Sequence, residues 1–276
     1  MRSALFFGPF DELAEPSAVL RVASIAEEHG WDGLFLWDHM FRAPGEEGRW
    51  PEVADVWVTL AAVAATTSRL IVGPMVAPLA RRRPQKVARE TVTLDRLAGG
   101  RTVLGVGLGV DRGGELERFG EVTDERVRAE MLDEAIALVR ELWSGALVDH
   151  HGRHFQASGV QFLPTPVRSR IPIWGAAVGT RPRRAPLQRA AALDGLFPVG
   201  ADVEQVQWML DVVRDARGSL DGFDVAFEVD PDRPPSREDL TRLGVTWVAA
   251  SFPESVPIER VEDIARQGPA ALLAGS

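Results

Sequence analysis

The sequence contains no cysteine, which excludes disulfide bonds, cysteine-ligated zinc sites, iron–sulfur clusters and thiol nucleophiles. It has no apolar run near the roughly 20 residues that a membrane-spanning helix needs, and residues 1–7 lack a signal-peptide pattern. Basic residues are fewer than acidic ones, 31 against 40, and the net charge of -9 argues against nucleic-acid or anionic-membrane partners. We therefore expect a soluble, cytoplasmic protein that binds neither nucleic acid nor membrane.

Lysine is nearly missing as well, because Lys86 is the one lysine among the 31 basic residues. Any phosphate site must therefore use arginine, backbone amides or helix N-termini. The run Arg81, Arg82 and Arg83 could receive a phosphate group. A short basic run before a helix is more often a solvated surface, and this is the interpretation that we favour.

Short apolar runs alternate along the chain with stretches of helical spacing. The runs expected as strands are 3–7, 33–37, 70–73, 102–106, 171–174, 195–197, 225–228 and 245–249. The stretches expected as helices are 17–29, 57–67, 84–97, 124–143, 181–193, 203–217, 236–243 and 258–267. This alternation predicts a parallel sheet, and eight units favour a closed (β/α)8 TIM barrel over an open doubly wound α/β sheet. We expect one domain over residues 1–276.

Two connections depart from the regular pattern. Residues 145–167 interrupt it with scattered apolar positions and predict a short hairpin insertion before the fifth strand. Only 17 residues intervene between Phe227 of the seventh expected strand and Val245 of the eighth. A connection this short cannot cover much of the barrel.

Polar residues at the carboxyl ends of the strands are the candidates for function, because barrel active sites lie there. Asp38 and His39 follow the second expected strand, and histidine is suited to proton transfer near neutral pH. The alternative is that Asp38 caps the next turn and His39 is an ordinary loop residue. We take both as the catalytic candidates.

Two further patterns have a structural alternative. His150, His151 and His154 have metal-like spacing but fall in an expected hairpin turn, so we predict no metal site. The glycines of residues 105–109 fail the G-x-G-x-x-G test for a dinucleotide site. They fit either a strand end where backbone approaches a flat ligand or a tight turn without one.

Several segments together resemble a known family. They are "GWDGLFLWDH" at 30–39, "RLIVG" at 69–73, "PLARRRPQKVARE" at 78–90, "TLDRLAGGR" at 93–101, "LGVGLG" at 104–109, "IPIWG" at 171–175, "RAA" at 189–191 and "DGLFP" at 194–198. In this order they are similar to the bacterial-luciferase-like family of flavin- and deazaflavin-dependent oxidoreductases, which are TIM barrels. The segment at 93–101 is the most specific of them.

The resemblance implies that reduced FMN, or the deazaflavin F420, binds in the barrel mouth with His39 near the reactive face of its ring. It also implies a cis peptide bond between Met75 and Val76, behind the ring. It places the cofactor phosphate on the loops after the fifth and sixth strands, at Gly175, Gly179, Thr180, Arg181 and Gly200. Further predicted cofactor contacts lie at other strand ends, at Gly8, Gly107, Gly109 and Asp111.

The sequence departs from this family in two places. Luciferase-type members carry a long insertion near the seventh strand, which is reduced here, so the site should be open or completed by a partner subunit. Ala176, Ala177 and Val178 stand where relatives commonly have glycines in the loop after the fifth strand. Relatives also form dimers through early helices, so the resemblance implies a homodimer.

We favour an FMN-dependent oxidoreductase, specifically a monooxygenase that uses reduced FMN and O2 on a small organic substrate. A separate flavin reductase would supply its reduced FMN. The first alternative is an F420-dependent oxidoreductase that transfers a hydride, and the second is a non-catalytic, flavin-binding barrel. A metal-dependent hydrolase is disfavoured because too few carboxylates and histidines lie at strand ends.

Overall fold

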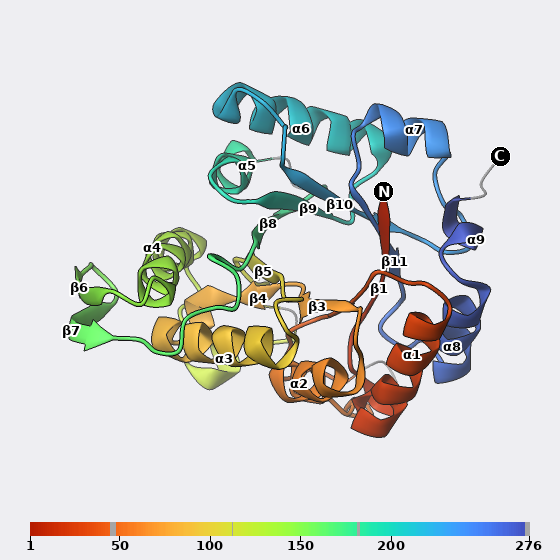
Figure 1. Ribbon diagram of the computed structural model, residues 1–276, viewed down its shortest axis with the longest axis horizontal. Coiled ribbons are helices and arrows are strands. Elements are labelled where there is room, and N and C mark those ends of the chain that lie inside the picture. The colour runs from red at the N-terminus through yellow and green to blue at the C-terminus, as the bar shows by residue number, and fades with distance from the viewer. Residues whose placement is uncertain (45–47, 112, 181–182, 274–276) are drawn as a thin grey trace.

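The computed structural model describes residues 1–44, 48–111, 113–180 and 183–273 as a barrel of parallel strands surrounded by helices (Figure 1). The strands of the barrel are β1 (Arg2–Phe7), β2 (Gly33–Leu36), β3 (Ile71–Pro74), β4 (Ala77–Pro78), β5 (Leu104–Gly107), β8 (Ile173–Val178), β9 (Gly195–Val199), β10 (Asp224–Val229) and β11 (Trp247–Ser251). The helices are α1 (Pro16–Glu28), α2 (Val56–Thr66), α3 (Pro84–Leu97), α4 (Glu125–Trp143), α5 (Arg184–Ala191), α6 (Val203–Arg217), α7 (Arg237–Arg242), α8 (Ile258–Gln267) and α9 (Ala270–Leu273). Short 3-10 turns lie at Asp11–Ala14, Leu79–Arg81 and Glu117–Phe119. In these ranges, no helix is both long and apolar enough to cross a bilayer.

The strand order β3-β2-β1-β11-β10-β9-β8-β5-β4 makes a nearly closed ring. The first strand pairs with the last, since β1 lies parallel to β11. Strands β3 and β4 are the two halves of one barrel strand, and a bridge between Val72 and Thr102 connects this strand to the segment before β5. The nine strands therefore occupy eight positions, which confirms the predicted (β/α)8 barrel.

Local signals in the sequence fix where several helices begin. Asp124 caps α4 by accepting hydrogen bonds from the backbone N–H groups of Arg126 and Val127. Asp202 and Gln205 form a reciprocal capping box at the start of α6. Helices α1 and α3 carry proline in the first turn, where a missing N–H costs nothing.

The barrel interior is filled by aromatic side chains. Phe35, Trp174 and Trp247 lie in contact with one another, with ring centroids 5.5–5.6 Å apart. Alternate residues of each strand point inward, and the others pack under the surrounding helices. The interior is therefore a packed core, and open space for a ligand must lie above it, at the carboxyl ends of the strands.

Two sequence predictions on connections are confirmed, and three strand boundaries are corrected, since β5, β8 and β11 each begin two residues later than expected. The insertion is an antiparallel hairpin of β6 (Leu147–His151) and β7 (Gln156–Gln161), which lies beside α4 in Figure 1. The connection from β10 to β11, described throughout, is short and contains the single helix α7. Strand β8 begins two residues later than expected and runs through Val178, because Ala176, Ala177 and Val178 pair with β9. These residues are therefore strand rather than loop.

Candidate active site

The mouth of the barrel has mainly apolar walls. Phe6, Trp37, Met75, Val76, Ala176 and Val199 all belong to, or pack against, the interior cluster at the carboxyl ends of their strands. The ionisable side chains at this end of the barrel include His39 after β2 and Glu228 on β10. An apolar cleft with a few polar groups is typical of a site for an organic ligand or cofactor.

His39 is held by a carboxylate from another part of the chain. Its Nδ1 lies 2.9 Å from Oε2 of Glu115, whose side chain is only 4% exposed. An ionised carboxylate can only accept, so Nδ1 donates its proton and Nε2 is the free acceptor of the neutral ring. Phe10 packs against the imidazole, with ring centroids 5.8 Å apart. The result is a histidine of fixed tautomer, with Nε2 unpartnered among the described residues.

Glu115 is ionised because its partners outweigh its burial. Burial by itself raises the pKa of this carboxyl, but the hydrogen bond from His39, the charge of that ring when it is protonated and the charge of Arg81 lower it below its ordinary value, together with the Met40 N–H. The Arg81 guanidinium donates to Oε1 at 2.6 Å, and the Met40 N–H donates to the same atom at 2.5 Å. The sequence analysis missed Glu115. Its position in the loop after β5, on the functional rim of the barrel, was the available signal.

Asp38 is buried beneath His39 and is fully paired. Its two carboxylate oxygens accept from Arg82 at 2.8 and 2.5 Å, and its backbone carbonyl accepts from Arg81 at 2.6 Å. Burial lowers the pKa of Arg82, but the charge and hydrogen bonds of Asp38 raise it above the ordinary value. With both oxygens engaged, Asp38 is placed to position the loop that carries His39.

The interpretation of the arginine run as a solvated surface is wrong. The side chain of Arg81 is 2% exposed and that of Arg82 is 17% exposed, and only Arg83 lies in solvent. Their partners, Asp38 and Glu115, are remote in sequence, and a buried charge persists only where such partners are present. The run is therefore part of the site's framework.

The peptide bond between Met75 and Val76 is cis, as the resemblance implies. The glycines of β5 lie directly against this segment. A Cβ on Gly105 would lie 2.6 Å from the carbonyl oxygen of Pro74, and one on Gly107 would lie 2.5 Å from Val76. These two glycines make room for a neighbouring strand, a packing reason that the sequence analysis did not consider.

Most other predicted cofactor glycines also have packing reasons within the chain. A Cβ on Gly8 would collide with the ring of Phe10, and one on Gly109 would lie 2.8 Å from Pro78. Gly179 packs closely on Ala201. Gly109 and Gly200 both have a positive φ, of 76° and 57°, and Gly200 differs in that a Cβ there would meet nothing within 4 Å. Cofactor contact at these positions stays a prediction.

The remaining residues predicted to contact the cofactor lie in a strand, in turns or outside the described residues. Gly175 lies inside β8 with its Cα turned toward Ala190 of α5, so its placement in a phosphate-binding loop is corrected. Asp111 caps the turn after β5 by accepting from the N–H of Leu116 at 2.6 Å. Thr180 is an exposed turn residue, and Arg181 lies outside the described residues.

Glu228 is a second ionisable group of the mouth that the sequence analysis missed. Its Oε2 accepts a hydrogen bond from the N–H of Gly200 at 2.9 Å. Burial raises the pKa of Glu228 to about 7, and the bond from Gly200 opposes that change only in part. The signal available in the sequence was a carboxylate at an inward position of an otherwise apolar strand.

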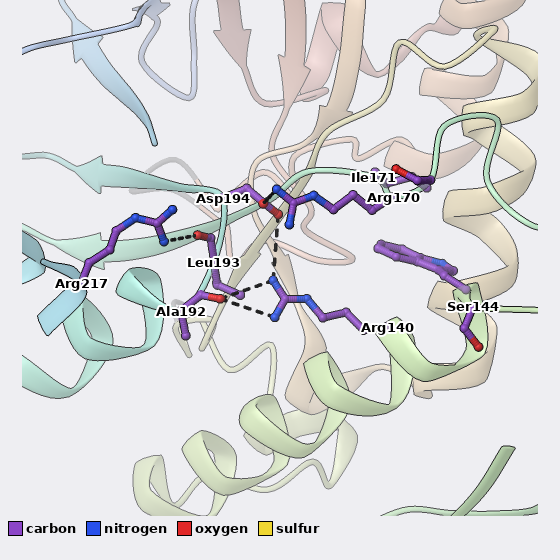
Figure 2. Close-up of a pocket in the computed structure, with 10 residues that line it drawn as sticks. Arg140, Ser144, Arg170, Ile171, Ala192, Leu193, Asp194 and Arg217 are labelled. Carbon is purple, nitrogen blue, oxygen red and sulfur yellow. Dashed lines mark hydrogen bonds and ion pairs between the residues drawn. The ribbon is translucent and has the colours of Figure 1, made fainter. Parts of the chain in front are cut away.

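Figure 2 shows a hollow at the opposite end of the barrel, where Ile171 precedes β8 and Asp194 precedes β9. Arg170 donates to Asp194 at 2.8 Å, while Arg140 and Arg217 donate to carbonyl groups after α5 at 3.4 and 3.1 Å. Cations at a helix C-terminus stabilise the helix dipole. This hollow is therefore a structural feature, remote from His39.

Two of the three hairpin histidines, His150 and His154, lie against carboxylates of α4, and His151 is exposed. His150 Nδ1 lies 3.2 Å from Glu141, and His154 Nε2 lies 3.5 Å from Glu130. Across the described ranges, no group of three or more histidine and carboxylate side chains is arranged to hold a metal ion. The cluster connects the hairpin to the helix.

Comparisons with known proteins agree with this geometry. The model of the luciferase-like monooxygenase family matches residues 5–240. The F420-dependent glucose-6-phosphate dehydrogenase of Nakamurella multipartita is 30% identical over 254 residues, covering 86% of this chain and 70% of that protein. F420-dependent glucose-6-phosphate dehydrogenase 1 of Rhodococcus jostii is 36% identical over 166 residues. This match covers 59% of this chain and only 48% of that relative.

A solved structure shares the whole architecture. An F420-dependent secondary alcohol dehydrogenase, in complex with an F420–acetone adduct, superposes with a TM-score of 0.79 and covers 98% of both chains at 18% identity. At this identity the likeness shows the fold alone. The family model and the sequence relatives go further: the chain belongs to the luciferase-like monooxygenase family, a family of oxidoreductases built on the (β/α)8 barrel.

Proposed function

We propose that this protein is an F420-dependent oxidoreductase that transfers a hydride between the cofactor and an alcohol or carbonyl substrate. The observation that carries the proposal is the His39–Glu115 pair at the barrel mouth, with Nδ1 anchored and Nε2 free. The sequence alone favours FMN and O2, but both sequence relatives described above are named as F420-dependent dehydrogenases. Their names support the deazaflavin over FMN.

The residues of the mouth fit a flat ring system. Trp37, Val76 and Ala176 offer an apolar surface at the carboxyl ends of three strands. Trp37 adds a buried indole Nε1 that has no hydrogen-bond partner among the described residues, so it is a donor available to a ligand. We assign Trp37, Val76 and the backbone near Gly200 to holding the cofactor.

The roles of the chain's own groups follow from their geometry. F420, when bound, supplies or accepts a hydride, and the substrate hydroxyl proton must move separately. His39 Nε2 accepts that proton during alcohol oxidation and returns it during reduction. The Glu115 carboxylate keeps the proton of Nδ1 in place and stabilises the imidazolium that forms, while Asp38 and Arg82 hold the loop.

Cofactor titration tests this proposal. We expect oxidised F420 to bind with a micromolar dissociation constant, measured by fluorescence, and FMN to bind at least tenfold more weakly. FMN binding without F420 binding, together with O2-dependent turnover, would instead support the monooxygenase and its separate flavin reductase. Binding of either cofactor without any turnover would support the non-catalytic barrel.

The names of similar proteins suggest the first substrates to assay. Glucose 6-phosphate comes from the sequence relatives, and 2-propanol represents the secondary alcohols of the structural neighbour. Reduction of F420 by either compound, monitored as the loss of the F420 absorbance, would identify the substrate class. The homodimer implied by the resemblance is a separate proposal, which sedimentation of the purified protein tests.

A further inference from the structure

Glu228 lies where a ligand in the mouth would meet it. Val225 and Phe227 of β10 pack into the core beneath the helices, whereas Ala226 belongs to the interior cluster. Strand alternation therefore turns Glu228 inward, one layer above Ala226 and close to the carboxyl end of the strand. Its Oε2 accepts from Gly200 N–H, and Oε1 has no partner within the described residues.

In the described part of the chain, no positive charge offsets the negative charge that Glu228 carries when it is ionised. The neighbouring strands β9 and β11 carry no titratable side chain. In the loops that follow β9 and β10, Asp202 is engaged in capping α6, and Asp230, Asp232 and Arg233 are exposed. The pKa of Glu228 is set by its burial and by the Gly200 N–H rather than by these charges. With a pKa raised to about 7 by burial, Glu228 is protonated in about half of the molecules at neutral pH.

We propose that Glu228, as a neutral carboxylic acid, donates a hydrogen bond from Oε1 to an acceptor oxygen of the redox cofactor. Its Oε2 continues to accept from Gly200, so both functions of the acid are used. Acceptor oxygens are present in F420 and in FMN, as ring carbonyls and phosphate. The inference rests on the proposed function only in requiring one of these cofactors in the mouth.

Such a contact makes cofactor binding dependent on pH. Only the protonated acid can donate, and the ionised form places a negative charge beside an acceptor oxygen. The cofactor complex therefore raises the pKa of Glu228, and the free protein must take up a proton on binding above pH 7. By linkage, affinity is highest below pH 7 and falls as pH rises, approaching tenfold for each pH unit.

The test is cofactor affinity from pH 6 to pH 9, measured by fluorescence titration with F420 and separately with FMN. For the wild type we expect the affinity to fall by up to about 100-fold over this range. Glu228→Gln should bind with nearly constant affinity, since an amide accepts from Gly200 and donates to the cofactor at every pH. Glu228→Ala should bind about tenfold more weakly than the wild type at pH 6.

Glu238→Gln, on the exposed first turn of α7, is the matched control and should follow the wild type. Equal pH dependence of Glu228→Gln and the wild type would overturn the inference. Binding of FMN but not F420 would overturn the proposed function, while the FMN series would still decide the role of Glu228. Absence of binding by both cofactors at every pH would overturn both. If Glu228→Ala does not fold, the Gln variant alone decides.

Discussion

On the side of the mouth formed by β2 and the loop after β5, Glu115 meets a histidine, an arginine and a backbone N–H; on the side formed by β9 and β10, Glu228 meets one N–H. Burial raises the pKa of both carboxyl groups. The partners of Glu115 reverse that effect, whereas the single N–H at Glu228 does not. Two glutamates at the same end of the barrel are thus set up as an anion and as an acid.

His39→Ala should have the largest effect of these variants, because it removes the imidazole that the Glu115 carboxylate orients. We expect kcat/KM for F420 reduction to fall by roughly 10²–10⁴-fold, as for loss of a general acid or base. The assay uses whichever of glucose 6-phosphate and 2-propanol is oxidised. His151→Ala, exposed on the hairpin, is the control. An unchanged rate for His39→Ala would mean that the pair is structural.

Arg81→Met should leave Glu115 and Asp38 without one of their buried cations. Breaking a buried ion pair by removing one partner costs about 3–5 kcal/mol of folding stability. Urea unfolding of Arg81→Met against Arg83→Met, whose arginine is exposed, measures this cost. The control should change by less than about 0.5 kcal/mol. Similar losses in both variants would contradict the buried network.

The two glutamates should respond to pH with opposite sign. Glu228 has a raised pKa, so the unfolded chain ionises first and wild-type stability falls as pH rises from its ordinary pKa of 4.5 to about 7. Glu228→Gln avoids this loss and should be about 2–3 kcal/mol more stable than wild type at pH 8, with little difference at pH 4.5. Glu115 has a lowered pKa, so its stabilisation is present above pH 4.5 and disappears in acid.

Urea unfolding at both pH values measures the difference, with Glu238→Gln as the control for loss of an exposed charge. A stability gain for Glu228→Gln that is the same at pH 4.5 and pH 8 would show that its carboxyl is not protonated in the folded protein.

The smallest effect is expected at the other end of the barrel. Arg170, whose side chain is 75% exposed, pairs with Asp194 in the hollow of Figure 2. Arg170→Gln should change stability by less than about 0.5 kcal/mol, as for other exposed ion pairs, and leave the affinity for F420 unchanged. A weaker cofactor affinity in this variant would place ligand binding at the wrong end of the barrel.

The spacing of apolar residues was sufficient to predict the barrel, because the buried face of each strand and helix is visible in its own local sequence. The positions of Asp38 and His39 followed in turn, since they are adjacent to a strand end. The hairpin insertion was visible for the same local reason. The end of β8 was placed four residues too early, at 174 rather than Val178, because small apolar residues such as Ala176 and Ala177 suit both a strand and a loop.

The partners of these residues were not predictable in the same way. Glu115 binds His39 across 76 positions of sequence, and Arg82 binds Asp38 across 44. Such pairs depend on which strand ends become neighbours in the closed barrel, and spacing along the chain does not report that. The charge run was therefore assigned to solvent, and Glu228 was considered only as part of a strand.

The close fit of Gly105 and Gly107 against the Met75–Val76 segment has a consequence for protein engineering. A larger side chain at either glycine would push on a neighbouring strand before it reached a ligand, so this wall offers no route to a changed specificity. The ends of the next two strands around the barrel are freer, since Val178 of β8 is 39% exposed and Val199 of β9 is only half-buried. Libraries that aim to change the accepted substrate should therefore vary the ends of β8 and β9 and leave β5 intact.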